Sequence, residues 1–186
     1  MTESAATGGD PTDTALIARW QRGDERAATL LVERHARPLA RFVSSLGARA
    51  DAEEVVQDTF VRAFASLDRF RGDSSLRTWL FTIARNLWRD RLRAAHASAR
   101  GGEVPIEEEH AATEHDALDL AVADETAARM RMAMARLRGL QREIFTLRVT
   151  EGLSYKEIAA IVGSTEGAAR VHYFNALRAV KEFLND

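Results

Sequence analysis

The chain has 186 residues, of which 46% are hydrophobic and 29% charged, with a formal net charge of −2. This length gives room for one ordinary domain or two small ones, and a composition with only three prolines favours helix throughout. The absence of cysteine excludes disulfides and thiolate metal sites, which suits a reducing cytosol. No apolar run approaches the roughly 20 residues of a membrane span, so we expect no membrane insertion.

The net charge conceals an uneven distribution. Residues 101–128 contain nine acids and no Lys or Arg, residues 79–100 contain five Arg and one acid, and residues 129–150 contain six Arg and one acid. Binding depends on the local field rather than on the sum of all charges. A nucleic-acid partner is therefore compatible with this slightly acidic chain.

The N-terminal part is predicted to be a disordered tail followed by helices. Residues 1–13 are small and polar and lack the basic start and apolar middle of a signal peptide. A helical block is expected over residues 14–97. Its first helix spans Thr14 to Arg22, and Asp24 then caps a second helix that ends at Leu46.

Two more helices complete this block. Asp51 is expected to cap the third, with Glu54 three residues later in a pattern like a capping box. A loop is expected over residues 68–73, after which Ser74 or Ser75 starts the fourth helix, which extends to the end of the block.

Residues 98–117 are predicted to be a flexible acidic linker, because they contain glycines, a proline and an acidic cluster without a sustained apolar period. A second helical block follows over residues 118–186. Helices are expected at Leu118–Leu137 and Leu140–Thr150. The predicted fold class is therefore all-α, with two small helical domains.

The end of the chain has a helix-turn-helix pattern. Ser154 can cap a short helix over Tyr155–Val162, Gly163 makes a tight turn, and Thr165 caps a last helix over Glu166–Leu184. The N–H groups at the start of that helix suit a DNA phosphate. An ordinary amphipathic helical hairpin is the alternative.

Five side chains of the last helix lie opposite or beside its apolar face and are predicted to meet DNA: Arg170, Val171, His172, Asn175 and Arg178. Asn can pair with adenine, and Val can contact a thymine methyl. A mostly neutral His172 should release few counterions, so its removal should hardly change the salt dependence of binding.

The fourth helix of the first block carries a polar stripe at helical spacing: Thr78, Thr82, Arg85, Asn86, Arg89 and Arg93. Arg can neutralise phosphates, and Asn can read a base edge. Aromatic residues accompany the stripe: Phe70, Trp79 and Trp88. Cations and aromatic rings on one element are typical of single-stranded DNA binding.

Alternatively, these aromatic residues belong to the core and the arginines form a solvated face. We expect core positions for Trp20, Phe64 and Phe81, whereas Trp79 and Trp88 are open between core and DNA.

Two segments together resemble the extracytoplasmic-function (ECF) sigma factors, group four of the sigma-70 superfamily. One comprises residues 51–64 with residues 70–86, which include Phe70-Arg-Gly-Asp-Ser-Ser-Leu-Arg-Thr-Trp; the other is Gly152-Leu-Ser-Tyr-Lys-Glu-Ile-Ala with the helix beyond Thr165. The resemblance implies sigma region two over residues 14–97 and sigma region four over residues 118–186. The sequence departs from the family pattern in the last helix, where His172 and Asn175 stand at positions that are often basic in the family.

The resemblance implies a sigma factor that binds core RNA polymerase and directs promoter-specific initiation. Region two would dock on the clamp helices of the largest subunit through Asp51, Glu54, Gln57, Asp58 and Arg62. The acids at the helix start, Asp51, Glu53 and Glu54, could equally be a solvated face that the helix dipole favours. In the minus-ten reader, Phe70, Ser74 and Asn86 would line a pocket for a flipped base, with Trp79 and the arginine stripe beside it. Region four would read the minus-thirty-five element and meet the flap.

Other implied partners are promoter DNA and an anti-sigma factor, and the implied location is cytoplasmic. The acidic linker could mimic nucleic acid inside the polymerase or simply aid solubility. We expect no cofactor and no metal, because His110 and His115 lie in an acidic, flexible setting.

Two other classes compete with this interpretation. A stand-alone helix-turn-helix regulator would explain the second block but not residues 51–93, and it should bind its duplex site without polymerase, often as a dimer. An enzyme is not indicated, because Glu54 and Asp58 share a helix face without a partnering His and no phosphate-binding loop occurs.

Overall fold

The computed structural model describes residues 11–99 and 123–185. Every regular element within them is helical, as predicted. The helices are α1 (Asp13–Gln21), α2 (Glu25–Ser45), α3 (Ala52–Ala65), α4 (Leu76–Ala99), α5 (Ala123–Ala135), α6 (Gly139–Phe145), α7 (Tyr155–Val162) and α8 (Glu166–Asn185), with a 3-10 turn at Leu67–Arg69 and a π turn at Thr146–Thr150. Most of the predicted tail and nearly all of the predicted linker, including His110 and His115, lie outside the described residues.

Several helix starts are fixed by the predicted capping residues. Asp24 accepts a hydrogen bond from the backbone N–H of Arg26, and Ser75 accepts one from that of Thr78, each at 3.1 Å. The prediction for Asp51 is wrong: its side chain makes no capping bond. With φ −101° and ψ 3°, this residue is not in the extended conformation that an N-cap requires.

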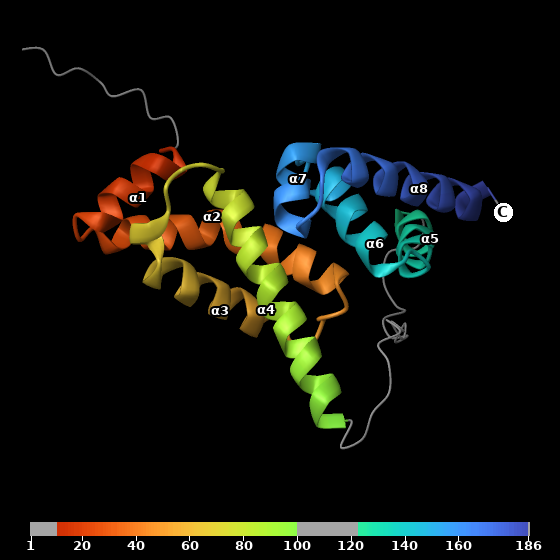
Figure 1. Cartoon of the computed structure of the whole chain (residues 1–186), viewed down its shortest axis with the longest axis horizontal. Helices are drawn as coiled ribbons and strands as arrows, with labels where there is room; N and C mark the ends of the chain where they lie inside the picture. The colour runs from red at the N-terminus through yellow and green to blue at the C-terminus, as the bar shows by residue number, and fades with distance from the viewer. Residues whose placement is uncertain (1–10, 100–122, 186) are drawn as a thin grey trace, which may run out of the picture.

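The first four helices lie together (Figure 1) and contribute most of the residues of the larger buried core. Phe42 of α2 and Phe81 of α4 are both fully buried, and their ring centroids lie 5.1 Å apart. Trp20 packs on Phe64 with centroids 5.4 Å apart. The core position expected for Phe81 is therefore confirmed, whereas Trp20 and Phe64 are partly buried and pack against the core.

The C-terminal helices share a second, smaller core. Ala133 and Leu137 of the α5 region, Phe145 of α6, and Ala176 and Val180 of α8 form its buried centre. The helix expected over Leu140–Thr150 instead ends at Phe145 and continues as the π turn. The wider turn is closed by a bond from the N–H of Glu151 to the carbonyl of Thr146, 3.2 Å long.

The two halves pack against each other along α4 and α7 (Figure 1). The π turn and α6 also contact α2. Leu147 and Ile158 of the C-terminal half belong to the same buried cluster as Leu80 and Phe81 of α4. None of the described helices is long and apolar enough to cross a membrane.

Candidate nucleic-acid interface

Three residues of the predicted polar stripe share one exposed surface of α4. Asn86, Arg89 and Arg93 are exposed and line an open hollow together with Asp90. Arg93 forms an ion pair with Asp90, three residues earlier. This surface offers an amide and two guanidinium groups to solvent within two helical turns.

Arg85, another member of the stripe, lies elsewhere. Its side chain is only 6% exposed, and its Nε donates a hydrogen bond to Oε2 of Glu143 on α6 at 2.6 Å. The structure therefore places Arg85 between the two halves of the chain rather than beside Asn86 on the open face.

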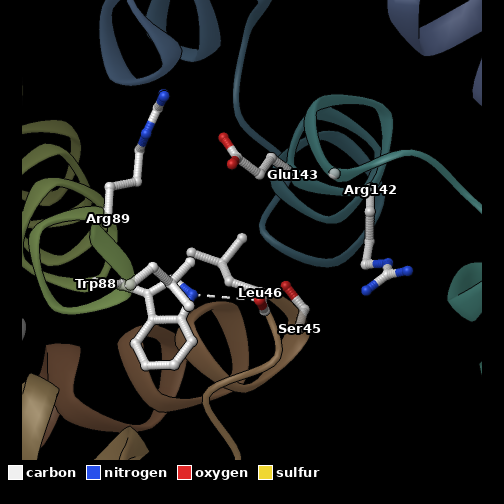
Figure 2. Close-up of a pocket in the computed structure, with 8 residues that line it drawn as sticks. Ser45, Leu46, Trp88, Arg89, Arg142 and Glu143 are labelled. Carbon is white, nitrogen blue, oxygen red and sulfur yellow. Dashed lines mark hydrogen bonds between the residues drawn. The ribbon is translucent and has the colours of Figure 1, made fainter. Parts of the chain in front are cut away.

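The aromatic residues separate into two groups. Phe70 and Trp79 are half-buried and pack on each other with centroids 5.1 Å apart, at the loop that precedes α4. Ser74, in the same loop, is exposed. Trp88 belongs to the core, where its Nε1 donates to the carbonyl of Leu46 at 3.2 Å (Figure 2).

A shallow pocket lies beside Trp88 at the seam between the halves, lined by α4, the end of α2 and α6 (Figure 2). Arg89 borders it on the α4 side and Glu143 on the α6 side. Arg142 turns its guanidinium to the backbone carbonyl of Met134, 2.9 Å away, and burial lowers the pKa of Arg142. The pocket therefore lies at the contact between the two halves of the chain.

The outer surface of α8 combines exposed apolar and basic side chains. Thr165 caps the helix by accepting from the N–H of Ala168 at 3.2 Å. Arg170 and Val171 are exposed, as predicted for a face that meets DNA. Phe174, which the sequence analysis did not select, is also 55% exposed. Its position, four residues after Arg170, could have shown that it shares that face.

The polar groups of α8 are mostly engaged within the helix. Arg170 pairs with Glu166 at 3.4 Å, and Arg178 donates to Oδ1 of Asn175 at 2.8 Å. His172 and Asn175 are half-buried. The large apolar side chains that α8 exposes, Val171 and Phe174, both lie in its first half.

The predicted polymerase contacts lie on α3, where a cation from α4 joins two of them. Arg91 donates to Oε1 of Glu54 at 2.9 Å and to Oδ2 of Asp58 at 2.6 Å. These hydrogen bonds raise the pKa of Arg91. The other predicted contacts are all exposed: Asp51, Gln57 and Arg62.

Acidic side chains of the C-terminal half face cations of the N-terminal half, a feature that the sequence analysis missed. Glu151 is paired with Arg41 and Arg77, and Glu157 accepts a 3.3 Å hydrogen bond from the Thr78 hydroxyl. Within the described part of the chain, no group of three or more His, Cys, Asp or Glu side chains could hold a metal ion.

Burial acts to raise the pKa of Glu157. Hydrogen bonds from Ser154 and Thr78 and the charge of Arg77 outweigh this effect, so the pKa of Glu157 lies below its ordinary value.

Comparison with known families gives two matches, one in each half. Sigma-70 region 2 matches residues 31–97, and Sigma-70, region 4 matches residues 127–180. The first match covers α3 and most of α4, and the second covers α6, α7 and most of α5 and α8.

Similar proteins cover nearly the whole chain. The ECF RNA polymerase sigma-E factor of Escherichia coli K12 is 35% identical over 91% of this chain and 92% of its own. The RNA polymerase sigma-H factor of Pseudomonas aeruginosa PAO1 is 33% identical over 92% of this chain and 93% of its own.

Two solved structures are also similar. The sigma factor RpoE in complex with the anti-sigma factor NepR from Bartonella quintana superposes with a TM-score of 0.67 and 28% identity over 84% of this chain and 96% of its own. CnrH in complex with the cytosolic domain of CnrY gives 0.67 and 31% over 93% of this chain and 97% of its own. With sigma regions 2 and 4 in this order and relatives of this identity along nearly its full length, the chain belongs to the ECF sigma factors, the subunits that direct RNA polymerase to specific promoters.

Proposed function

We propose that the open face of α4 captures the melted non-template strand of the minus-ten element. Asn86 reads a base edge, while Arg89 and Arg93 follow the phosphates. Phe70 and Trp79 lie at the entry to α4, where their partly open rings supply stacking surface. The observation that carries this proposal is the exposure of an amide and two guanidinium groups together on one hollow of region two.

We assign minus-thirty-five recognition to the first half of α8. Thr165 presents helix-start N–H groups to a phosphate, and Arg170 adds a charge. Val171 and Phe174 are 59% and 55% exposed and offer apolar contact to thymine methyls in the major groove. Asn175 and Arg178 lie further along the helix, where their mutual hydrogen bond must yield to DNA.

The acidic side of α3 is our candidate for docking on the clamp helices of the polymerase. Glu54 and Asp58 keep 67% and 44% of their side chains exposed despite their pairing with Arg91. Region four is proposed to meet the flap. The protein thus acts as a binding subunit without catalysis of its own, in the cytoplasm where the polymerase works.

An anti-sigma factor is a further proposed partner. One similar solved structure is the sigma factor RpoE in complex with the anti-sigma factor NepR, and the other is CnrH in complex with the cytosolic domain of CnrY. Their likeness to this chain supports control by a protein partner of this kind.

The test is transcription from a promoter library by purified core polymerase with and without this protein. We expect specific start sites that share two spaced upstream elements. Asn86→Ala should relax selectivity at the downstream element by about 1–3 kcal/mol. Gln21→Ala, which removes an exposed amide at the end of α1, is the matched control and should leave selectivity unchanged.

Two outcomes would contradict the proposal. If Asn86→Ala keeps wild-type selectivity at the downstream element, α4 does not read that element through this residue. If the wild-type protein binds a duplex site tightly without core polymerase, a stand-alone regulator becomes the better account.

A further inference from the structure

The hollow on α4 contains a carboxylate among the groups assigned to DNA. Asp90 lines it together with Asn86, Arg89 and Arg93, and the Asp90 side chain is 52% exposed. DNA phosphates repel a carboxylate that lies beside them. A surface that only followed phosphates would gain nothing from this negative charge, so phosphate tracking does not explain Asp90.

Arg93 holds one side of the Asp90 carboxylate. Its Nη2 donates a hydrogen bond to Oδ1 of Asp90, three residues earlier on the same face of the helix. Oδ2 has no hydrogen-bond partner among residues 11–99 and 123–185. The ion pair therefore restricts the orientation of the carboxylate and leaves one oxygen open to accept a hydrogen bond.

The amide of Asn86 lies one helical turn before Asp90. Residues four apart are neighbours on a helix surface, with about 5–6 Å between their Cβ atoms. Asn86 is exposed, and its amide has no hydrogen-bond partner in the described part of the chain. An unpaired amide and an unpaired carboxylate oxygen therefore line one hollow, close enough together for a single base to contact both.

The four bases differ in what they offer to these two groups. An ionised carboxylate only accepts hydrogen bonds, and adenine, cytosine and guanine each carry an exocyclic amino group that can donate one. Thymine has no amino group, and its single ring N–H lies between two carbonyl oxygens that repel a carboxylate. The Asn86 amide both donates and accepts, so it can pair with the base edge beside the amino group.

We propose that Asp90 is a specificity-determining residue of the minus-ten reader. Its open oxygen accepts a hydrogen bond from the exocyclic amino group of the base that Asn86 contacts, and it thereby selects against thymine at that position. Arg93 orients the carboxylate, while its remaining N–H groups stay available to a phosphate. The inference rests on the role assigned above to Asn86 and adds the class of base that the hollow takes.

The first experiment uses holoenzyme on promoters that are randomised over the downstream element. The position that Asn86 reads is the one at which Asn86→Ala relaxes selectivity. At this position the wild type should use thymine about tenfold less than the preferred base, because a charge-assisted hydrogen bond is lost. Asp90→Asn keeps the shape of the side chain and can donate to a thymine carbonyl, so this discrimination should fall to about threefold or less.

Two variants serve as controls for this measurement. Glu33→Gln removes the same charge from an exposed position on α2, outside the hollow, and should keep the wild-type discrimination. Asp90→Glu keeps the charge and the acceptor oxygens and should retain part of the discrimination against thymine. A loss of only the negative charge would not distinguish between bases in this way.

The second experiment removes the amino group instead of the carboxylate. Hypoxanthine for guanine, purine for adenine or 2-pyrimidinone for cytosine deletes this group at the preferred base, in a promoter whose minus-ten element is already mismatched so that pairing strength does not enter. The wild type should form open complexes about tenfold less well on the analogue. Asp90→Ala, which has no acceptor, should use the two promoters equally well.

The outcomes separate this inference from the role of α4. If Asp90→Asn changes the use of all promoters by one common factor, or if the wild type does not distinguish the analogue, Asp90 only adjusts the local charge and the inference is overturned. If Asn86→Ala relaxes selectivity but Asp90→Asn does not, the inference about Asp90 fails alone. If Asn86→Ala leaves selectivity unchanged, the α4 role fails and this inference fails with it.

Discussion

His35 is a buried titratable side chain that ties α2 to α1. Its Nε2 donates to Oδ2 of Asp13 at 2.8 Å, and Arg34 donates to the other oxygen of the same carboxylate at 2.6 Å. Burial lowers the pKa of His35 below its ordinary value of 6.5, although the charge of Asp13 acts to raise it. The neutral imidazole is therefore the form that suits the folded chain.

This shift predicts a stability that depends on pH. Because the pKa of His35 is lower in the folded chain, the unfolded chain takes up a proton first as the pH falls through 6.5, and stability is lost. We expect the urea midpoint of the wild type to fall between about pH 7.5 and about pH 5.5, and His35→Gln to show a smaller fall.

His96→Gln is the matched control, because His96 is exposed on α4. It should retain the wild-type pH dependence. Equal pH dependence in the wild type and in His35→Gln would show that His35 does not carry the effect.

At the scale of single elements, α7 is held at its start by a complete capping box. Oγ of Ser154 accepts from the N–H of Glu157 at 3.3 Å, and the Glu157 carboxylate accepts from the N–H of Ser154 at 2.9 Å. The helix has only eight residues, too few to be stable in isolation. The cap and the packing on α4 therefore decide whether α7 forms.

Ser154→Ala should destabilise the chain by about 1 kcal/mol in urea unfolding, because one helix-start N–H loses its partner. Ser74→Ala removes an exposed serine hydroxyl that caps no helix and should change stability by much less. A loss as large for Ser74→Ala as for Ser154→Ala would contradict the capping argument.

Glu157, the carboxylate of the capping box, makes the stability of the chain depend on pH in the acidic range. Since the pKa of Glu157 lies below its ordinary value of 4.5, its contribution is fully present above pH 4.5 and is lost as the pH falls through the lower, folded value. The difference in urea midpoint between about pH 5 and about pH 3 should therefore be smaller for Glu157→Gln than for the wild type. An unchanged difference would contradict the assignment.

The recognition helix α8 makes a separate prediction about salt. Arg170→Ala should reduce the slope of log affinity against log salt for the minus-thirty-five duplex by about 1, because one phosphate contact is lost. His172→Ala should change the slope little. The slopes are to be measured with holoenzyme on promoter DNA, and a large change for His172→Ala would show that this side chain carries a charge at the phosphates.

Local signals were enough to predict most elements. The helix starts at Asp24, Ser154 and Thr165 were found from residue type and position, because a cap depends only on the next three residues. Asp51 had the same type of pattern but the wrong backbone conformation. The π turn before Glu151 was missed; it contacts α2, which lies far from it in the sequence.

The candidate site was only partly predictable for the same reason. Helical spacing placed Asn86 and Arg89 on one stripe, and both are exposed there. The same spacing included Arg85, whose surroundings are set by Glu143, 58 residues later in the chain. No periodicity within one helix reports which part of its surface another domain covers.

At the scale of the whole molecule, the two sigma regions share one buried apolar cluster that continues from α1 to the start of α8. Leu80 of α4 and Ile158 of α7 are both essentially unexposed members of it. Hydrophobic contact and charge pairing therefore coincide at the same seam. A seam of this kind couples the stability of the two regions, whereas a linker by itself would leave them independent.

This coupling predicts how the full chain melts. In calorimetry at low salt, we expect the wild type to unfold in a single transition, with region four melting together with region two. E143Q/E151Q should separate the signal into two transitions, with the smaller region four unfolding first because it has the smaller core of its own. E25Q/E33Q, which removes the same charge from exposed positions on α2, should keep one transition. Two well-separated transitions in the wild type at low salt would show that the regions fold independently and that the seam contributes little to stability.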